Sequence, residues 1–393
     1  MDACRLRVCM LAYTFYENDG RVIRYAEALA QAGAQVDVIA LRREGQSRTE
    51  QLHGVNVVRI QQREKNETGK RQYLWRLLKF FMLSSVELTR RHWRARYDVI
   101  HVHSVPDFEV FAAAVPKLLG AKLILDIHDI VPEFYAAKFK VGTDSLAFRL
   151  LRFVEKRSAR FADHVIIANH LWQQKLTGRA VGAAKCSAYI NYPDLSIFSP
   201  SLRRQRADGP FVLIYPGTLN WHQGLDIAIE AFSIALQDAP DMQFHIYGEG
   251  SAKPKLQAMV QALQLENKVF LHPPMPLRQI AAVMASADLG VVPKRNDAFG
   301  GDAFSTKVME FMALGVPVLL SRTRVDTHYF DDTLVRFFDP GNARALAGAM
   351  LDAYGDRDAA ARRAQRALAF AQRNSWSEKS RDYIALVEGL AHA

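Results

Sequence analysis

The chain has 393 residues, of which 49% are hydrophobic and 23% are charged, and this length and composition favour a globular protein of two domains. No segment reads as about 20 uninterrupted apolar residues, so a transmembrane helix is not expected, and three cysteines without metal-ligand spacing argue against a disulfide framework. Residues 1–200 hold 30 Lys and Arg against 20 Asp and Glu, so the whole net charge of +10 lies in this half and predicts an anionic partner, either nucleic acid or a membrane surface.

Short apolar, β-branched runs alternate with segments of helical period along the first half, a pattern typical of βα units with a parallel sheet. The run Leu6–Ala12 follows the N-terminus directly, where a signal peptide would have its apolar core, so we expect a cytoplasmic protein. A helix is expected over Arg21–Ala32, with Gly33 at its C-terminal end. Further strands are expected at Val36–Ala40, Val55–Ile60, Val99–His103, Leu123–Ile127 and His164–Ala168.

The segment from Lys70 to Arg96 departs from this pattern because it is helical in character, basic and apolar at once. Tryptophans at positions 75 and 93 stand among eight Lys and Arg residues. Basic residues with aromatic and aliphatic neighbours suit a helix that lies on an anionic bilayer. An ordinary domain helix with a solvated charged face explains the segment about equally well. The charge excess of the first half favours the membrane surface, with a protein that is peripheral on the inner face of the cytoplasmic membrane.

In the second half a new series of βα units begins. A stretch rich in Pro, Ser and Arg at Ser199–Pro210 predicts a linker. We therefore expect domains over residues 1–200 and 201–375, followed by a C-terminal segment over 376–393. Two doubly wound α/β domains facing each other would bind ligands at the carboxyl ends of their strands, in the cleft between them. The strands expected here are Phe211–Tyr215, Gln243–Tyr247, Val269–His272, Leu289–Val292 and Val316–Leu320.

The most informative segment is Phe304–Val318. Ser305 or Thr306 can cap a helix whose first turn offers N–H groups to a diphosphate. Lys307 adds a positive charge for phosphate. Glu310, one turn later on the same face, can accept hydrogen bonds from ribose hydroxyls. By spacing alone, an ordinary surface ion pair between Lys307 and Glu310 explains the segment equally well.

This segment resembles the nucleotide-sugar signature of glycosyltransferase family 4, whose members have the GT-B fold. The resemblance runs nearly from end to end, and the motifs carry weight because they occur together and in order. In the first half they are Asp19–Val22 and Asp126–Asp129, which match the acceptor-domain loops. In the second half they are Tyr215–Leu219 with Gly224–Asp226, Ile246–Gly250, Ala287–Pro293, Asp339–Asn342 and Ser375–Ser377.

The resemblance implies two Rossmann-like domains and a retaining transfer of a hexose-type sugar without a metal ion or other cofactor. It implies that residues 376–393 form a helix that crosses back to the first domain. It places Gly217, Thr218 and Gly248 in the turns that bind the donor. His128 is implied to face the donor sugar and to help position the reacting groups as a catalytic residue, whereas without the resemblance a hydrogen-bonded structural histidine is the ordinary interpretation. Its neighbours Asp126 and Asp129 are expected to fix its tautomer. Asp302 is implied to contact the hydroxyls of the donor sugar as a catalytic carboxylate.

Two features depart from the family pattern. Asp302 is shorter than the usual carboxylate at its position, which affects reach or donor choice. Many members place Arg and Lys in the glycine turn, where this chain has Thr218 and Gln223. Arg295 and Arg322 are candidates to supply the missing phosphate contacts.

Three weaker signals have ordinary explanations. Gly20 can let the chain approach the donor phosphate or the acceptor, but a simple turn glycine is nearly as good an interpretation. The pair His101 and His103 has metal-like spacing that is too common to support a metal site. Asp356 and Asp358 resemble the carboxylate motif of metal-dependent transferases, yet their place between two helices favours helix capping.

The sequence therefore predicts a glycosyltransferase with a UDP- or GDP-sugar donor and a lipid-linked glycan acceptor, in bacterial surface polysaccharide synthesis. A nucleotide-sugar epimerase and a non-catalytic subunit of a glycan-assembly complex remain alternatives. The epimerase would need no acceptor, and the non-catalytic subunit would release no product. Nucleic acid is not expected as a partner, because neither a recognition helix nor an aromatic platform is evident.

Overall fold

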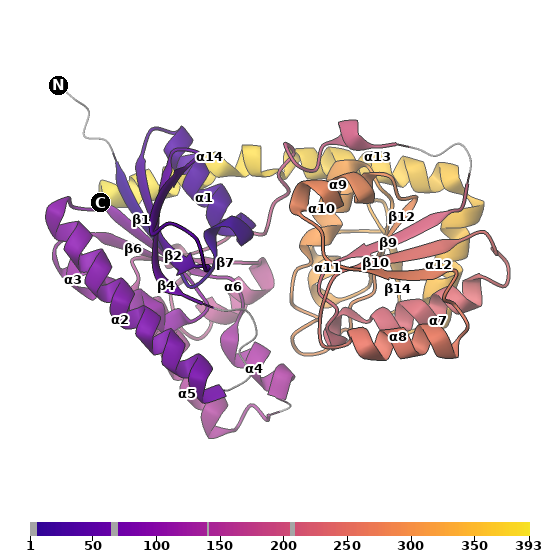
Figure 1. Cartoon of the computed structure of the whole chain (residues 1–393), viewed down its shortest axis with the longest axis horizontal. Helices are drawn as coiled ribbons and strands as arrows, with labels where there is room; N and C mark the ends of the chain where they lie inside the picture. The colour runs from indigo at the N-terminus through magenta and orange to yellow at the C-terminus, as the bar shows by residue number, and fades with distance from the viewer. Residues whose placement is uncertain (1–5, 64–69, 140, 205–208) are drawn as a thin grey trace. The chain divides into compact units, whose positions relative to one another are not determined.

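The computed structural model describes residues 6–63, 70–139, 141–204 and 209–393. They form two compact units, each built on its own sheet (Figure 1). Unit 1 extends to Asn191 and also includes Lys379–Ala393, and unit 2 is Tyr192–Glu378. This division differs by a few residues from the expected domains of residues 1–200, 201–375 and 376–393.

Packing explains where the boundaries lie. Phe198 is buried in the core of unit 2, and Leu195 and Ile197 pack against the same core, so the chain joins unit 2 before the expected linker begins. The N–H of Trp376 donates to the carbonyl of Pro193 at 3.0 Å, which keeps the first turn of the last helix in unit 2. The expected linker Ser199–Pro210 contains a short 3-10 helix, η4 (Pro200–Leu202), and its residues 205–208 lie outside the described residues.

Unit 1 contains an eight-stranded sheet, counted over the described residues, in the order β3-β4-β2-β1-β5-β6-β7-β8. The pair β3 and β4 is antiparallel, and the other neighbours are parallel. The six strands expected from the sequence are confirmed, and the short strands β3 and β8 add to them. The bounds are β1 (Arg7–Ala12), β2 (Gln35–Arg42), β3 (Thr49–Leu52), β4 (Val55–Gln62), β5 (Val99–His103), β6 (Lys122–Ile127), β7 (His164–Ile167) and β8 (Cys186–Ala188).

The order of the strands decides which helix covers which face of this sheet. The chain passes from β1 to β2 in one direction across the sheet and from β4 to β5, β6, β7 and β8 in the other. Because such crossovers are right-handed, α1 lies on one face and α2 to α6 lie on the opposite face. The helices are η1 (Tyr16–Asn18), α1 (Gly20–Gln31), α2 (Lys70–Arg94), η2 (Asp107–Ala113), α3 (Ala114–Leu118), α4 (Val131–Phe139), α5 (Leu146–Phe161), α6 (His170–Thr177) and η3 (Ala183–Lys185).

Helix α1 begins and ends one residue earlier than expected, and α2 ends two residues earlier. Helix α1 is capped at its start by Asp19, whose carboxylate accepts from the N–H groups of Arg21 and Val22, and Gly33 follows its end with a φ of +95° as a C-terminal glycine should. Helix α2 ends at Arg94, so Arg96 lies beyond it. None of the helices in the described residues has the length and apolar composition needed to cross a membrane.

Unit 2 contains a six-stranded sheet among the described residues, in the order β11-β10-β9-β12-β13-β14, with the paired strands parallel. Its strands are β9 (Val212–Pro216), β10 (Gln243–Tyr247), β11 (Val269–His272), β12 (Leu289–Val292), β13 (Val318–Ser321) and β14 (Arg336–Phe338). Its helices are η5 (Trp221–Gln223), α7 (Leu225–Ala235), α8 (Lys253–Ala262), α9 (Leu277–Ala285), α10 (Thr306–Leu314), α11 (Arg324–Tyr329), α12 (Ala343–Gly355), α13 (Arg357–Arg373) and the first turn of α14 (Trp376–Ala391).

Each unit has a topological switch point, where the chain leaves a central strand in one direction and later returns to its other side. In unit 1 this point lies between β1 and β5, and in unit 2 it lies between β9 and β12. Loops diverge at the carboxyl ends of such strand pairs and leave room for a ligand. Candidate site residues fall on these loops, and Gly248 and His128 follow the strands β10 and β6 next to them.

Candidate active site

A pocket of about 450 Å³ lies in unit 2, at the carboxyl ends of β9 and β10 and beside the start of α10. Its polar lining comes from the turn after β9, the turn after β10 and the first turn of α10, and the segment from the loop after β11 into α9 adds apolar side chains. The first three of these segments meet because β9 and β10 are neighbours and α10 leaves the strand on the other side of β9. The pocket brings together six of the predicted donor-binding residues, namely Gly217, Thr218, Gly248, Thr306, Lys307 and Glu310.

The start of α10 differs from the prediction in one respect. Ser305 occupies the N-cap position, but its side chain makes no capping hydrogen bond. Its hydroxyl oxygen is buried without a hydrogen-bond partner. Neither Ser305 nor Thr306 therefore caps the helix through its side chain as expected, since Thr306 is already the first helical residue. The first turn keeps the N–H groups that a helix leaves unpaired at its start.

Lys307 lies across the glycine turn. Its ammonium nitrogen is 5.3 Å from the centre of the Tyr215 ring. A Cβ atom added at Gly217 would meet Cε of Lys307 at 2.1 Å, so only glycine leaves room for this arrangement. Burial lowers the pKa of Lys307 to about 8, with Glu310 acting in the opposite direction and Lys294 in the same direction. Lys307 is thus a desolvated cation beside a carboxylate.

Tyr215 was not singled out in the sequence analysis. The Tyr215 hydroxyl oxygen lies 3.0 Å from the carbonyl oxygen of Thr218 and 3.0 Å from the side-chain oxygen of Gln223, and its one proton is shared between these acceptors. The turn that lacks the family's usual Arg and Lys is thus held together by a buried tyrosine and a glutamine. The backbone of Gly248 packs directly against the same turn. A Cβ there would lie 1.8 Å from the carbonyl oxygen of Gly217, so a larger residue would clash with the turn.

Replacing Gly217 with alanine should displace Lys307 and weaken donor binding. Gly217 has a φ of +147°, so the variant also carries backbone strain of about 1–3 kcal/mol. Gly341→Ala is the matched control, because Gly341 has a φ of +80° and open space around its added Cβ. Thermal unfolding and nucleotide titration of both variants separate the two effects. If Gly341→Ala weakens nucleotide binding as much as Gly217→Ala, strain alone accounts for the loss.

The arginines that were candidates to supply phosphate contacts are engaged elsewhere. Arg295 forms a two-point ion pair with Asp226 at 2.8 and 2.9 Å, and Arg322 pairs with Asp332 at 3.1 Å. Neither lines the pocket. Lys294, which the sequence analysis passed over, is a cation whose charge lowers the pKa of Lys307.

Asp302 and Lys294 hold the loop that leads into α10. Arg324 donates to Asp302 at 2.7 Å, and Asp302 is not among the residues that line the pocket. The buried ammonium of Lys294 donates to the carbonyl of Ala303 at 2.7 Å and pairs with the buried Asp326 at 2.8 Å. The role of Asp302 toward a donor sugar therefore stays a prediction.

In unit 1 the predicted catalytic residue His128 belongs to a buried cluster at the carboxyl ends of β5 and β6. Its centre is Asp126, which is completely buried. Arg21 donates to both oxygens of Asp126 at 2.6 and 2.8 Å, and also to the carbonyl of Tyr189 at 2.8 Å. Burial alone would raise the pKa of Asp126, but Arg21 and His128 hold it well below its usual range.

Asp126 also contacts two imidazole rings. Nε2 of His128 lies 3.1 Å from Oδ2 of Asp126, and Nδ1 of His103 lies 3.2 Å from the same oxygen. Because an ionised carboxylate only accepts, a hydrogen bond from His128 requires the proton on Nε2 and leaves Nδ1 as an acceptor. The expectation that Asp126 fixes the tautomer of His128 therefore fits the geometry.

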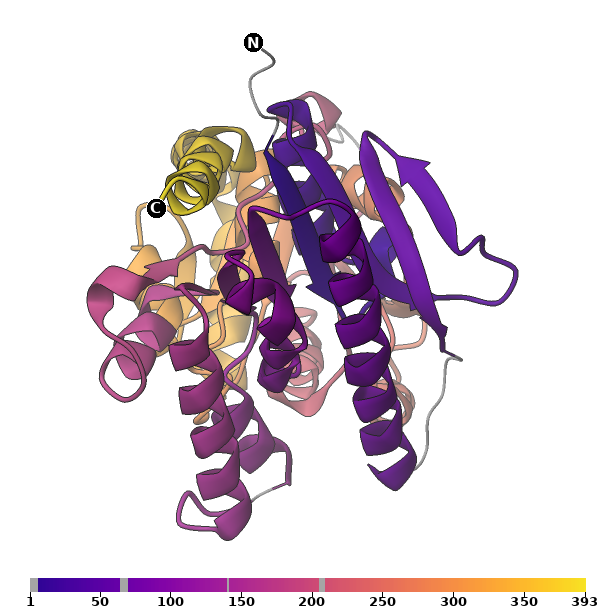
Figure 2. The same ribbon diagram turned by 90° about the vertical axis from the view of Figure 1, so that its left-hand side faces the viewer.

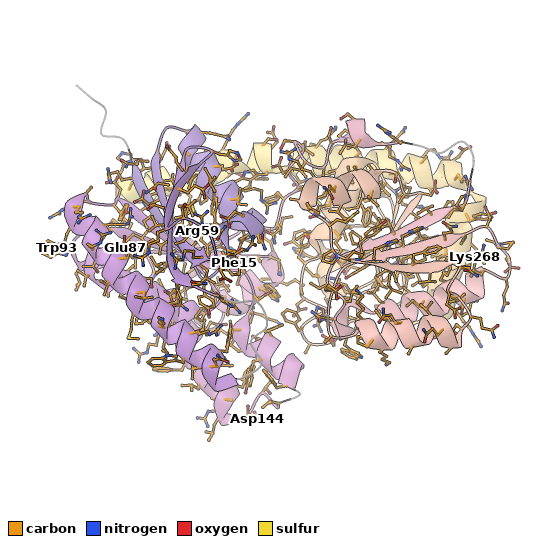
Figure 3. All side chains as sticks on the ribbon, viewed as in Figure 1. Phe15, Arg59, Glu87, Trp93, Asp144 and Lys268 are labelled. Carbon is orange, nitrogen blue, oxygen red and sulfur yellow. The ribbon has the colours of Figure 1, made fainter. Side chains whose placement is uncertain are left out.

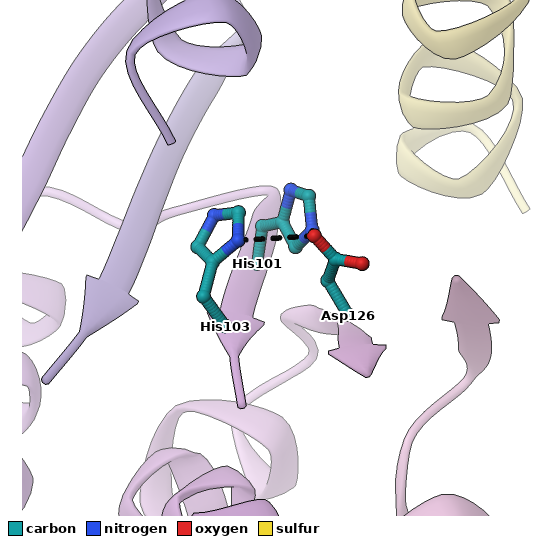
Figure 4. Close-up of side chains that lie close together, drawn as sticks. All are labelled: His101, His103 and Asp126. Atoms are coloured by element: carbon teal, nitrogen blue, oxygen red, sulfur yellow. Dashed lines mark hydrogen bonds and ion pairs between the residues drawn. The ribbon is translucent and has the colours of Figure 1, made fainter. Parts of the chain in front are cut away.

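His101 links this cluster to the last helix of the chain. Nδ1 of His101 is 2.8 Å from the hydroxyl of Tyr383, which lies in the part of α14 that belongs to unit 1. His101, His103 and Asp126 place one potential ligand atom each within 4.8 Å of one another, the arrangement drawn in Figure 4. Burial lowers the pKa of both histidines, so they are neutral near pH 7. Arg21 would stand next to any cation bound there, and the expected absence of a metal ion stays a prediction.

Comparison with known proteins now identifies the chain. The family described as "Glycosyl transferase 4-like domain" matches residues 21–188, within unit 1, and that described as "Glycosyl transferases group 1" matches residues 201–370, within unit 2. The chain is a glycosyltransferase of the GT4 type. The two parallel sheets and the structural neighbours together show that it has the α/β GT-B fold.

Two relatives and one solved structure show what this GT4-type glycosyltransferase is similar to. D-inositol 3-phosphate glycosyltransferase of Thermobispora bispora is 27% identical over 381 residues, which cover 91% of this chain and 86% of that protein. The amylovoran biosynthesis glycosyltransferase AmsK of Erwinia amylovora is 27% identical over 188 residues, or 47% of this chain and 45% of that protein. The structure of Anabaena HepE in complex with UDP-glucose matches with a TM-score of 0.72 at 18% identity and covers 99% of this chain and 100% of that chain.

The two remaining motifs of the GT4-type chain lie at the starts of helices, and the role of Gly20 toward a donor phosphate or an acceptor stays a prediction. Gly20 is the first residue of α1, and a Cβ added there meets nothing within 4 Å, so the described residues do not crowd it. Asp356 caps α13, because its carboxylate accepts from the N–H of Ala359 at 2.8 Å. The prediction that Asp356 is a helix cap is confirmed.

Proposed function

We propose that this GT4-type glycosyltransferase moves a hexose-type sugar from a UDP- or GDP-sugar onto a lipid-linked glycan in bacterial surface polysaccharide synthesis. One observation carries the donor assignment. The pocket of unit 2 places the ammonium of Lys307, the start of α10 and the carboxylate of Glu310 around one space of about 450 Å³. These groups match a diphosphate and a ribose in charge and in hydrogen bonding.

The chemistry of transfer uses these groups directly. The bond between the anomeric carbon and the leaving phosphate oxygen breaks, positive charge grows on the carbon, and negative charge grows on the phosphate. Lys307 and the N-terminal end of α10 stabilise that negative charge more in the transition state than in the ground state, which accelerates the step. Glu310 binds the ribose, which positions the diphosphate at the N-terminal end of α10.

We also propose that transfer proceeds with retention of configuration and without a metal ion. In this proposal the acceptor hydroxyl attacks from the face that the leaving phosphate occupies, and the phosphate takes the proton of the hydroxyl. The Nδ1 atom of His128, oriented by Asp126, faces the donor sugar. Asp302 contacts the sugar hydroxyls, for which it has to leave Arg324.

The acceptor side of the proposal concerns unit 1. The relative AmsK is named for amylovoran biosynthesis, which supports a polysaccharide pathway. Unit 1 carries the excess of basic residues, which would attract it to the anionic cytoplasmic face of a membrane, where a lipid-linked acceptor is located. Helix α2, with its basic and aromatic residues, is the segment expected to contact that surface.

One observation favours a second candidate, a non-catalytic subunit that binds nucleotide. Asp302 is tied to Arg324, and the glycine turn holds Thr218 and Gln223 in place of charged residues. Such a subunit would bind a donor but release no nucleotide on incubation with it.

A panel of UDP- and GDP-sugars offered to the wild type and to Glu310→Ala tests the proposal. We expect one preferred donor, with binding about 10- to 100-fold weaker in the variant because hydrogen bonds to a carboxylate are lost. Thermal shift reports binding, and released nucleotide reports hydrolysis or transfer. Glu230→Ala, an exposed residue of α7, is the matched control.

The outcomes separate the candidates. Binding with nucleotide release that survives treatment with EDTA supports an active, metal-independent transferase. Binding without release, with and without lipid acceptor, supports the non-catalytic subunit. Equal binding by the wild type and Glu310→Ala contradicts the assignment of the pocket.

A further inference from the structure

Helix α2 has two apolar faces. One faces the core of unit 1 through Leu77, Phe80 and Leu88, which are buried. The other faces away from it and is formed by side chains at helical spacing that are between 40% and 71% exposed. Trp93 marks the end of this outer stripe on α2 (Figure 3). The residues of the stripe are Trp75, Leu78, Met82, Val86 and Trp93.

Helix α5 repeats this arrangement, which the sequence analysis did not notice. Phe148 and Ala159 are buried on its inner face. Leu146, Leu150 and Phe153, spaced by four and three residues, form an outer stripe in which each side chain is between 55% and 82% exposed. Soluble proteins rarely leave such contiguous apolar surface open to water unless it has a partner.

The two stripes lie on the same side of unit 1. Helices α2 and α5 both follow strands from which the chain moves in the same direction across the sheet, so right-handed crossovers put them on one face. Both also pack against η2, which lies between them. Figure 2 shows the two helices running down the same side of unit 1, with their N-terminal ends pointing the same way.

The exposed charged side chains of α5 are all basic, and the exposed Asp144 lies just before the first turn of this helix. On α5 the exposed positions next to the apolar residues hold Arg149, Arg152, Lys156 and Arg157, and the one acidic residue of the helix, Glu155, is buried and paired with Arg179. The guanidinium of Arg157 lies 5.0 Å from the centre of the Phe153 ring. On α2 the one acidic residue, Glu87, is paired with Arg90 and Arg91.

We propose that α2 and α5 together form a docking surface for an anionic lipid bilayer, with both apolar stripes inserted at the interface and the basic side chains on the lipid phosphates. The proposal extends the membrane partner proposed above and adds α5 as a second, equally necessary contact. Long basic side chains beside apolar ones reach headgroups while the apolar groups enter the acyl boundary. The same charges disfavour a second copy of this chain as the occupant, because basic residues would face basic residues.

Co-sedimentation of the full-length protein with vesicles tests this surface. Vesicles of phosphatidylcholine alone are compared with an equal mixture of phosphatidylcholine and phosphatidylglycerol, at low and at high salt. The double variant Leu150→Ser, Phe153→Ser removes the stripe of α5, and Trp75→Ser, Met82→Ser removes that of α2. Leu263→Ser is the control, because it removes an exposed apolar side chain from unit 2, outside the proposed docking surface. Melting curves establish that each variant is folded.

We expect binding only to the anionic vesicles, weakened by salt as the Debye length falls from about 10 Å at 0.1 M to about 3 Å at 1 M. Each stripe variant should bind at least about tenfold more weakly than the wild type. Arg149→Gln with Lys156→Gln should weaken binding about fivefold per charge. Leu263→Ser should bind like the wild type.

Three results would overturn the proposal. The first is equal binding of the wild type to neutral and anionic vesicles, and the second is unchanged vesicle binding by the α5 variant. The third is a wild-type dimer that forms without lipid and is absent in the stripe variants. Nucleotide release from a soluble donor, measured without vesicles, should stay unchanged in all these variants. Loss of vesicle binding is thereby distinguished from failure of the proposed transferase, which would appear as absence of nucleotide release in the wild type.

Discussion

Replacing Lys307 with methionine is expected to lower the rate of sugar transfer at saturating donor by about 10²- to 10³-fold. Lys307 is a preorganised cation in the donor pocket, and removing one such group from the position where charge develops has effects of this size. Methionine has a similar length and is apolar, so the pocket keeps its shape. Lys268→Met, at a half-buried position of the same unit outside the pocket (Figure 3), is the control and should keep the wild-type rate.

The pH dependence of nucleotide binding gives an independent measure of the same group. The pKa of Lys307 is about 8 in the protein without ligand, below its ordinary value. The ammonium therefore loses its proton as the pH rises through about 8, while a bound diphosphate favours the protonated form. Affinity for UDP or GDP should fall above that pH by at most about tenfold per pH unit.

Isothermal titration from neutral to alkaline pH measures this slope. Lys307→Met should bind weakly at every pH, without the alkaline decline. A decline of the same slope in Lys307→Met would assign the titration to another group and contradict the assignment of Lys307.

Replacing Asp126 with asparagine is expected to lower the free energy of unfolding by about 3–5 kcal/mol. The side chain of Asp126 is completely buried and that of Arg21 is 7% exposed, so the variant leaves a buried guanidinium without its carboxylate. His103 and His128 lose the negative charge that they contact, and the amide leaves one acceptor oxygen for both rings and Arg21. Denaturant unfolding of the variant, followed by a signal from unit 1, measures the effect.

A second variant separates stability from function. Arg21→Met with Asp126→Leu removes both charges, and such replacements of buried pairs are often neutral in stability. We expect the double variant to be more stable than Asp126→Asn, yet to transfer sugar at least about 100-fold more slowly than the wild type, because His128 is no longer oriented. A double variant that is stable and fully active would show that the pair is structural alone.

Much of the fold could be predicted because burial leaves a clear pattern in the sequence. The buried parallel strands read as uninterrupted apolar runs, and β1 and β9 were predicted to within a residue at each end. The short strands β3, β8 and β14 were missed, since three or four residues at the edge of a sheet carry little pattern. The boundary of unit 2 was placed late because Phe198, in an apparent linker, is a core residue.

The grouping of the predicted residues around one pocket of unit 2 could be predicted because they lie in short, ordered motifs. Lys307 and Glu310 are one turn apart on α10, and Gly217 and Gly248 each follow a strand. The cluster around Asp126 was only partly foreseen, since Arg21, His101 and Tyr383 come from distant parts of the chain and meet only in the fold. The second apolar stripe on α5 was passed over because its residues also fit an ordinary core helix.

The position of Tyr383 has a consequence for how the protein is made. Tyr383 and Val387 are completely buried in unit 1, although all of unit 2 separates them from the rest of unit 1 in the chain. On the ribosome, where domains usually fold in the order of their synthesis, residues 192–378 emerge before these two side chains do. The N-terminal unit is therefore the last to be completed, and a transcript that stops short of the final helix yields an N-terminal unit with an open core.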